Sequence, residues 1–468
     1  MNEKNRNSQP FVMVFCVTVI MIGLSQFSTE TNLFGYQTKK VSPLSDVILI
    51  GEAKKVPLPH PIVNSALKAK DSAAIALREI DPANIVDFKK DSVTTLAYFF
   101  KALNALKKHK RKVRIGYFGD SMIEGDLITQ DVRGCLQDAF GGEGVGYVPI
   151  TSIVAGFRTS IIHSYEGWTT YNLLDESTKG HLLGISGYGF VPAVEKYVDS
   201  TSDKSATWVK YTAVNRKHIN KFHETKLLYG KGNDGNYVVI NGRHYKLNEK
   251  KQVNELVINN GTGCQCINAK FQCKNPIDIF GFTMESDSGV FVDNFSFRGN
   301  SGMPITKVTQ SVYSGTNDCL NYDLIILEYG LNVVNPRVTD FSWYVKGMTN
   351  TIKHIQASFP NASILLISVG DKGYRKEGEY QTDPSVPILV TTQKTIAEKN
   401  NLAFWSLYDA MGGNGAMVKW VEGDTVLANK DYTHFNFKGA HKVGKLLFNK
   451  LMSEYSDYNK KENRRHAD

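Results

Sequence analysis

Apolar residues follow two patterns along this chain, one typical of alternating strands and helices and one typical of short strands alone. The predominant pattern changes twice. Between residues 92 and 108 apolar positions recur at the spacing of one helix face, and an apolar run over 113–118 follows as a strand. A second helical pattern, over 127–140, stops at Gly141-Gly142, because glycine commonly ends helices. These residues predict a strand–loop–helix unit of the kind that builds a parallel sheet covered by helices.

Short β-branched and aromatic runs, separated by glycine and asparagine, replace the helical spacing beyond about Gly156. The stretches 207–214 and 237–240 are of this kind, and Asn241-Gly242 is a typical hairpin turn. The pattern predicts an all-β domain, similar to a jelly roll, over residues 156–276.

Alternating strands and helices resume after residue 277. The run 322–329 is almost continuously apolar, as expected of a parallel strand that helices bury on both faces. The chain is therefore expected to hold one three-layer α/β/α domain with a parallel sheet, formed by residues 94–155 and 277–455 and interrupted by the β domain. The other expected elements of its second part are strands 277–284, 289–297, 363–369 and 402–407, helices 341–358 and 387–400, and a last helix with Ala440, Val443, Leu447 and Leu451 on one face.

The N-terminal residues 1–28 are typical of an export segment. Lys4 and Arg6 precede an apolar run over 11–24. A membrane span needs ~20 residues, and the run reaches 17 when it is extended to Phe27. It is either a cleaved signal peptide or an uncleaved anchor, and the lack of a clean cleavage site favours an anchor. The body of the protein is expected in the periplasm or at the cell surface, behind a stalk over 29–93, with a short basic tail over 456–468.

Composition excludes few classes of fold or function. A chain of 468 residues is too long for one ordinary core, and 42% hydrophobic and 22% charged residues are typical of globular proteins. The net charge of +9 is compatible with an anionic polymer, but without a dense basic run it favours mere solubility and predicts no nucleic-acid partner. Cys264, Cys266 and Cys273 could form a disulfide cluster in an oxidising compartment, whereas nothing nearby completes a zinc site.

The candidate chemistry lies at Gly119-Asp120-Ser121, where the first strand ends and a helical pattern follows. A loop at this place presents a serine hydroxyl at the carboxyl edge of a parallel sheet. Asp431 and His434, just before the last helix, could supply the base and the group that orients it. Each residue also has a structural interpretation: Asp120 could hold the turn, Asp431 could cap the helix, and His434 could be structural.

Two further segments lie between these motifs. Gly299 follows a strand in the segment 297–302, and Asn332 ends the most apolar one. In this order, Ser121, Gly299, Asn332 and Asp431-x-x-His434 resemble the four blocks of the SGNH (GDSL-type) hydrolases. With a β domain between the serine and glycine blocks, the chain is similar to peptidoglycan O-acetylesterases and related exported polysaccharide deacetylases, whose insert resembles a carbohydrate-binding module.

The resemblance implies a role for each residue. Ser121 would be the nucleophile, His434 the base and Asp431 its orienter, while the Ser121 and Gly299 N–H groups and the Asn332 amide would form the oxyanion hole. Gly302 competes with Gly299 for that role, and Val333 stands where the family often has an acidic residue.

The implied activity is removal of O-acetyl groups from a polysaccharide, with peptidoglycan as the first choice and with no cofactor or metal. Two alternatives remain open. One is an O-acetyltransferase that uses the same serine, and the other is a non-catalytic glycan-binding protein.

Overall fold

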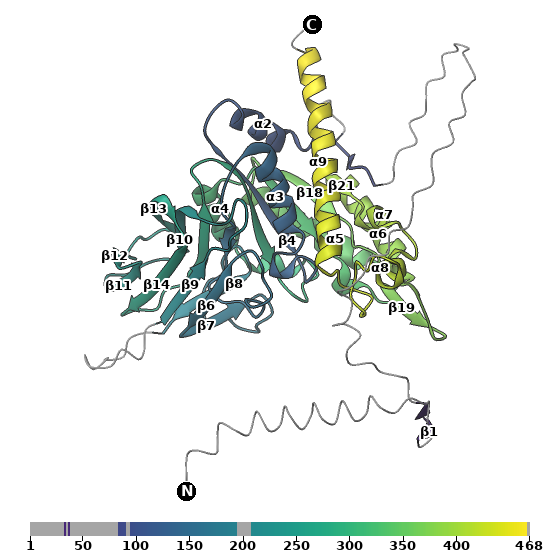
Figure 1. Ribbon diagram of the computed structural model, residues 1–468, viewed down its shortest axis with the longest axis horizontal. Coiled ribbons are helices and arrows are strands. Elements are labelled where there is room, and N and C mark those ends of the chain that lie inside the picture. The colour runs from purple at the N-terminus through teal and green to yellow at the C-terminus, as the bar shows by residue number, and fades with distance from the viewer. Residues whose placement is uncertain (1–31, 34–35, 38–82, 90–93, 194–206, 466–468) are drawn as a thin grey trace, which may run out of the picture. The chain divides into compact units, whose positions relative to one another are not determined.

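The structure, a computed structural model, is divided into two units, Met1–Leu77 and Arg78–Asp468, and almost all of the ribbon in Figure 1 belongs to the second. In the first unit β1 (Asn32–Leu33) pairs with β2 (Tyr36–Gln37). The export segment over 1–28 and most of the expected stalk lie outside the described residues. Within the described part, no helix is both long and apolar enough to cross a bilayer. The structure describes residues 32–33, 36–37, 83–89, 94–193 and 207–465.

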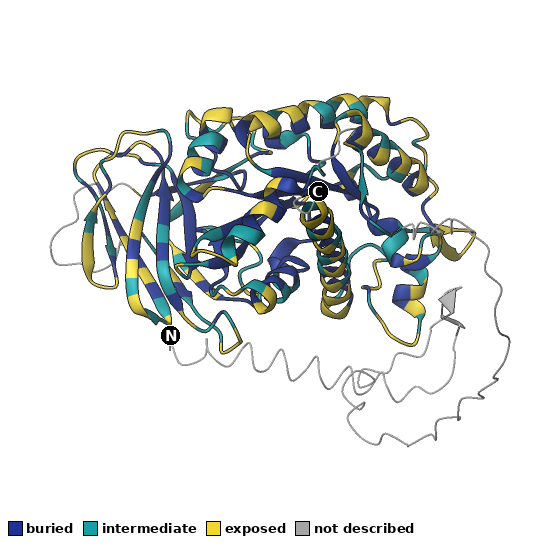
Figure 2. Ribbon diagram, turned by 90° about the horizontal axis from the view of Figure 1, so that it is seen from above, coloured by how far each residue is buried: buried dark blue, intermediate teal, exposed yellow. Residues whose placement is uncertain are grey.

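A six-stranded sheet is the centre of the second unit. Five of its strands run parallel, and β3 pairs antiparallel with β21 at one edge. The strands are buried along almost their whole length, which explains their apolar sequences (Figure 2). In spatial order they are β16 (Gly289–Ser296), β4 (Lys112–Gly119), β17 (Leu324–Glu328), β18 (Ser363–Ile367), β21 (Ala403–Trp405) and β3 (Val86–Asp87).

Helices cover both faces of this sheet, so the expected three-layer α/β/α domain is confirmed. The crossover from β4 to β16 runs one way along the sheet and the later crossovers run the other way, which places their helices on opposite faces. One face carries α2 (Ala97–Leu106), α3 (Thr129–Phe140) and α9 (Phe437–Arg465). The other carries α4 (Gln310–Leu320), α5 (Ser342–Ser358) and α6 (Ser385–Lys399).

The expected inserted β domain is also present, as two antiparallel sheets that share their own apolar core. Its Asn241-Gly242 turn has positive φ at both residues, as a tight hairpin requires. One sheet contains β13 (Asn254–Cys264), β10 (Phe222–Tyr229), β15 (Ile279–Glu285), β8 (Tyr188–Pro192) and β7 (Trp168–Asn172), with β5 (Gly146–Val148) paired to β15. The other contains β12 (Arg243–Lys246), β11 (Asn236–Ile240), β14 (Cys266–Cys273), β9 (Thr207–Thr212) and β6 (Ile162–Glu166).

Three boundaries differ from the sequence interpretation. Strand 277–284 was expected in the parallel sheet, but β15 lies inside the β domain, so that domain's sheets extend from residue 146 to 285. A strand buried on both faces has the same apolar pattern in either kind of sheet, and the pattern alone cannot separate them. Residues 86–87, assigned to the stalk, belong to the central sheet as β3, and α9 continues to Arg465, beyond the expected end at residue 455.

The cysteines of the β domain do not form the expected cluster. Cys264 and Cys266 both carry free thiols, although only one residue separates the end of β13 from the start of β14. They lie in different sheets of the sandwich, because β13 pairs with β10 and β14 pairs with β9 and β11. The folded state of this domain therefore depends on its apolar core and not on a link between these two residues.

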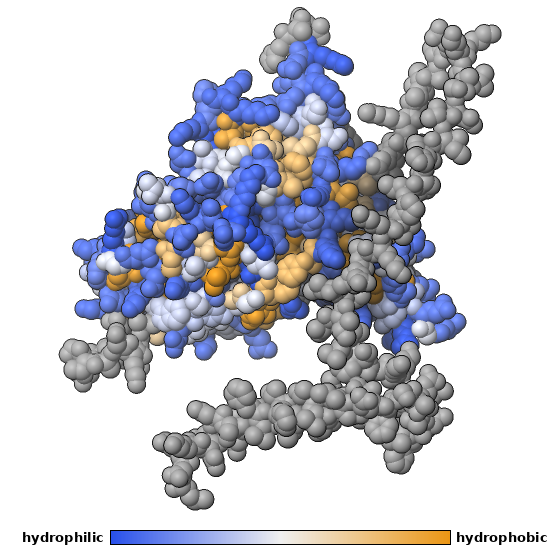
Figure 3. Space-filling model, viewed as in Figure 1, coloured by the Kyte–Doolittle hydropathy of each residue, from blue (hydrophilic) through white to orange (hydrophobic). Residues whose placement is uncertain are grey.

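Short elements complete the α/β domain. The hairpin of β19 and β20 projects from its surface next to α8 (Figure 1). The surface seen in Figure 3 is mainly hydrophilic and is interrupted by small hydrophobic patches. The short elements of the α/β domain are β19 (Gly373–Lys376), β20 (Glu379–Thr382), α7 (Leu407–Met411), α8 (Ala416–Glu422) and the 3-10 helices η2 (Glu124–Asp126), η3 (Pro304–Lys307) and η4 (Leu331–Val333).

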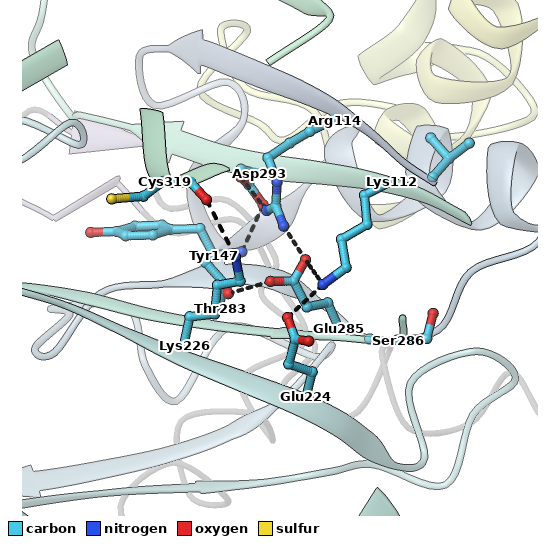
Figure 4. Close-up of polar contacts among 12 residues, drawn as sticks. Lys112, Arg114, Tyr147, Glu224, Lys226, Thr283, Glu285, Ser286, Asp293 and Cys319 are labelled. Atoms are coloured by element: carbon cyan, nitrogen blue, oxygen red, sulfur yellow. Dashed lines mark hydrogen bonds and ion pairs between the residues drawn. The ribbon is translucent and has the colours of Figure 1, made fainter. Parts of the chain in front are cut away.

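A buried cluster of charged side chains joins the two sheets that meet at β4 and β15 (Figure 4). Arg114 of β4 donates to both carboxylate oxygens of Asp293, at 3.0 and 2.8 Å, and to Glu285 of the β domain. Lys112 bridges to Glu224 of β10 at 2.5 Å. Because Arg114, Glu285 and Asp293 are almost fully buried, their charges need one another, and the cluster fixes the β domain against the α/β domain.

We expect the substitution Arg114→Leu to destabilise the protein by ~3–5 kcal/mol, because it leaves the buried carboxylate of Asp293 without its cation and leaves Glu285 with Lys112 alone. The matched control is Lys110→Leu, which removes a solvent-exposed ion pair with Asp287 and should cost at most ~1 kcal/mol. Urea denaturation of both variants measures the difference. Equal unfolding midpoints for the two would contradict the role assigned to the cluster.

Candidate active site

Ser121 lies in the turn that directly follows β4, at the carboxyl edge of the parallel sheet. The turn is tight, since a Cβ atom at Gly119 would come within 2.9 Å of the Ile123 side chain. Ser121 is only 9% exposed, and its Oγ lies 2.9 Å from Nε2 of His434. The structure thus brings together two residues that are 313 positions apart in the chain.

Asp431 completes a chain of three hydrogen-bonded side chains. Its Oδ2 lies 2.7 Å from Nδ1 of His434, and its Oδ1 accepts the backbone N–H groups of Thr433 and His434, each at 3.0 Å. Burial acts to raise the pKa of Asp431, but the hydrogen bonds from His434 and Thr433 outweigh it and lower that pKa. An ionised Asp431 favours the Nδ1–H form of His434, which leaves Nε2 free to accept the Ser121 proton.

Gly299 and Asn332 lie on the two loops that flank this turn. Gly299 is exposed, has φ +76°, and has nothing within 4 Å of where a Cβ would stand. The competing Gly302 is buried, and its N–H is already donated to Asn300 at 2.8 Å. Among the described residues the N–H groups of Ser121 and Gly299 have no acceptor, so they are available to an incoming oxyanion.

The Asn332 amide is held by two acceptors. Its Nδ2 donates to Oδ2 of Asp120 and to the carbonyl of Asn300, each at 3.0 Å. An oxyanion in this site would compete with the Asn300 carbonyl for one of these two hydrogens. Asp120 therefore does more than hold the turn through Met122 N–H, because it also orients the Asn332 amide.

Two carboxyl groups are buried directly behind the nucleophile. Glu328 ends β17 beside Gly119, accepts a 2.5 Å hydrogen bond from Tyr117, and leaves Oε1 without a partner. It shares a cavity of about 10 Å³ with Asp120, which is roughly the space of one water molecule. Burial raises the pKa of Asp120 to about 7 and, with the added repulsion from Asp120, raises the pKa of Glu328 to about 8.

The loop after the nucleophile is fixed by an ion pair that the sequence interpretation missed. Asp126 is buried and accepts hydrogen bonds from Arg133 at 2.8 and 2.7 Å and from Arg158 at 3.2 Å. Although burial opposes ionisation, the two guanidinium groups hold the pKa of Asp126 well below its usual range. No local sequence pattern signals this triplet, because Arg158 lies in a loop of the β domain.

The arrangement is suited to nucleophilic catalysis by a serine. It combines a hydroxyl, a base, an orienting carboxylate and free N–H donors on loops at one edge of a sheet. Within the described ranges, no group of three or more His, Cys, Asp or Glu side chains could hold a metal ion.

Comparisons with known proteins give the fold. The structure is similar to that of a peptidoglycan O-acetylesterase, with a TM-score of 0.65, 20% sequence identity, and coverage of 80% of this chain and 99% of that chain. The expected α/β domain with a β insert is therefore found in a solved enzyme structure. No family model matches the sequence, and no curated protein matches it.

Two weaker likenesses carry no argument because their TM-scores are 0.27. One is to an acetyl xylan esterase (16% identity, 34% of this chain and 79% of that chain). The other is to a family two carbohydrate esterase from Clostridium thermocellum in complex with cellohexaose (9% identity, 62% of this chain and 99% of that chain).

Because the carboxyl of Glu328 is buried, we expect the stability of the folded protein to depend on pH through this group. Burial raises the folded-state pKa of Glu328 from its ordinary value of 4.5 to about 8, so the stability that the protonated group contributes is complete below pH 4.5 and is lost as pH rises towards 8. Glu328→Gln cannot ionise and should avoid this loss, which amounts to at most ~1.4 kcal/mol for each pH unit.

Urea denaturation of the wild-type and Glu328→Gln proteins between pH 5 and 8 measures this difference. The control is Glu377→Gln, a substitution at an exposed position, and its free energy of unfolding should equal that of the wild type at every pH. Parallel curves for wild type and Glu328→Gln would show that Glu328 does not titrate as described.

Proposed function

We propose that this protein is an exported serine esterase that removes O-acetyl groups from a polysaccharide, with peptidoglycan as the polymer. The observation that carries the proposal is the Ser121–His434–Asp431 chain of hydrogen bonds at the edge of a sheet whose fold is shared with a peptidoglycan O-acetylesterase. Export is proposed because such a polymer lies outside the cytoplasm, and the apolar run over residues 11–24 supports it.

The reaction proceeds through an acetyl-enzyme. Oγ of Ser121 attacks the acetyl carbonyl while Nε2 of His434 takes the hydroxyl proton. The Ser121 and Gly299 N–H groups, joined by the Asn332 amide, stabilise the tetrahedral oxyanion. His434 then gives its proton to the departing sugar oxygen, which breaks the ester bond and leaves the acetyl group on Ser121.

Water completes the cycle. His434 removes a proton from the water, the resulting nucleophile attacks the acetyl-enzyme, and acetate leaves as Ser121 recovers its proton. Asp431 keeps the imidazole oriented and stabilises its charged form through both proton transfers.

A groove of about 390 Å³ between the two domains supports a polymeric substrate. On the side of the α/β domain it is lined by Glu124, three residues after the nucleophile, and by Ser296, three residues before Gly299. Aromatic and hydroxyl side chains line it, which is the combination that packs on sugar rings and bonds their hydroxyl groups. These include Thr151, Tyr165, Trp168, Thr170 and Tyr188.

Acetate release from O-acetylated peptidoglycan tests the activity. The wild-type protein should release acetate, and Ser121→Ala should lower the rate by at least ~10³-fold because the nucleophile is gone. Ser311→Ala, an exposed serine on α4, is the control and should keep full activity.

Two outcomes would contradict the proposal. Equal release by wild type and Ser121→Ala would exclude a serine esterase. Transfer of the acetyl group to an added saccharide, in place of free acetate, would establish the transferase alternative.

A substitution in the groove tests whether the polymer binds there. Thr170→Trp should fill the groove and lower kcat/KM on the acetylated polymer about tenfold, equivalent to ~1.4 kcal/mol of binding, while hydrolysis of a small acetyl ester stays unchanged. Thr169→Trp is the matched control, since this exposed neighbour on β7 points to the opposite face of the strand. Equal kinetics of both variants on the polymer would mean that the substrate does not use the groove.

A further inference from the structure

The backbone of Tyr432 adopts a conformation that side-chain-bearing residues rarely occupy. Its φ is +53°, in the left-handed region, which costs free energy for any residue with a Cβ atom. Tyr432 lies between Asp431 and His434, and the left-handed turn lets Asp431 face both the backbone N–H and the ring Nδ1 of His434. The geometry of the catalytic pair therefore depends on a strained residue that takes no part in the chemistry.

Three contacts from outside the catalytic loop hold Tyr432 in place. Its carbonyl accepts the Gly373 N–H at 2.7 Å, and its ring stacks on Tyr380 with centroids 3.5 Å apart and planes 7° from parallel. Its hydroxyl donates to Glu422 of α8 at 2.6 Å. Strain of this kind persists only where the surroundings over-determine the conformation.

Two of these contacts come from the β19–β20 hairpin. Gly373 opens β19, and a Cβ atom there would lie 2.5 Å from Cβ of Tyr432, so the close approach requires glycine. Tyr380 on β20 is 37% exposed, and the guanidinium carbon of Arg375 lies 6.0 Å from its ring centroid. The Tyr380 ring of this stack is exposed to solvent, whereas Tyr432 also packs against the core of the α/β domain.

The base of the hairpin is anchored to the helix that supplies the third contact. Asp371, just before β19, is buried and accepts from the Thr382 hydroxyl at 3.1 Å and from the N–H of Met417 in α8 at 2.7 Å. The Thr382 hydroxyl in turn accepts the Gly415 N–H at 2.7 Å. The hairpin and α8 thus form one block that contacts Tyr432 at three points.

We propose that the β19–β20 hairpin is a positioning device for catalysis: Tyr380 and Gly373 hold Tyr432 in its left-handed turn and thereby align Asp431 with His434. These are positioning residues and do not touch the substrate. The proposal rests on the proposed esterase activity for its kinetic readout, and a spectroscopic readout tests it independently of activity.

The test compares Tyr380→Ala with the wild type on a small chromogenic acetyl ester. We expect kcat to fall by ~10- to 100-fold with KM unchanged, because the base is misaligned while the binding surface is intact. Tyr380→Phe keeps the stacked ring and should restore wild-type values.

A proton NMR spectrum gives the second readout. The wild type should show the far-downfield resonance of an imidazole N–H bonded to a carboxylate, and Tyr380→Ala should lose it while keeping the wild-type melting temperature. Gln381→Ala is the matched control, because Gln381 is the exposed next residue on β20 and points to the other face of the hairpin.

The outcomes separate the two proposals. Tyr380→Ala with wild-type kcat and the wild-type downfield resonance would overturn the positioning role, whatever the activity of the enzyme. Absence of ester hydrolysis by the wild type itself would overturn the proposed function, and the resonance alone would then decide the role of the hairpin.

Discussion

The structure depends on one convergence, the 2.9 Å approach of the Ser121 hydroxyl to the His434 imidazole across 313 positions of sequence. A parallel sheet makes this possible, because the loops at the carboxyl ends of its strands gather at one edge whatever their order in the chain. The hydroxyl leaves the sheet after β4, whereas the imidazole reaches it from the loop before α9. Both loops are held by contacts that lie outside the triad.

The loop that carries Ser121 is held mainly by buried polar contacts, whereas the loop that carries His434 is held mainly by close packing. On the serine side, Asp126 ties the loop to two arginines, and Asp120 orients the Asn332 amide. On the histidine side, the support is the stack and backbone bond on Tyr432. The Arg114 cluster then fixes the β domain, so that the groove between the domains keeps a constant position relative to the nucleophile.

The sequence predicted the features that depend on local pattern. Strand periodicity located the parallel sheet and the β insert, and the Gly-Asp-Ser and Asp-x-x-His motifs pointed to residues that the fold brings together. The sequence did not predict features that depend on residues far apart in the chain. The pairing of β15, the burial of Asp126 and the stacking of Tyr380 on Tyr432 are all set by such tertiary contacts. An apolar run, an aspartate and an exposed tyrosine have the same local pattern whichever partner they meet.

The most direct test of the central claim is covalent labelling with a fluorophosphonate, which reacts with serines activated by a neighbouring base. Mass spectrometry of the digested protein should find a single adduct on Ser121 in the wild type and none in His434→Ala. An adduct on another serine, or equal labelling of Ser121 without His434, would contradict the account of an imidazole-activated nucleophile.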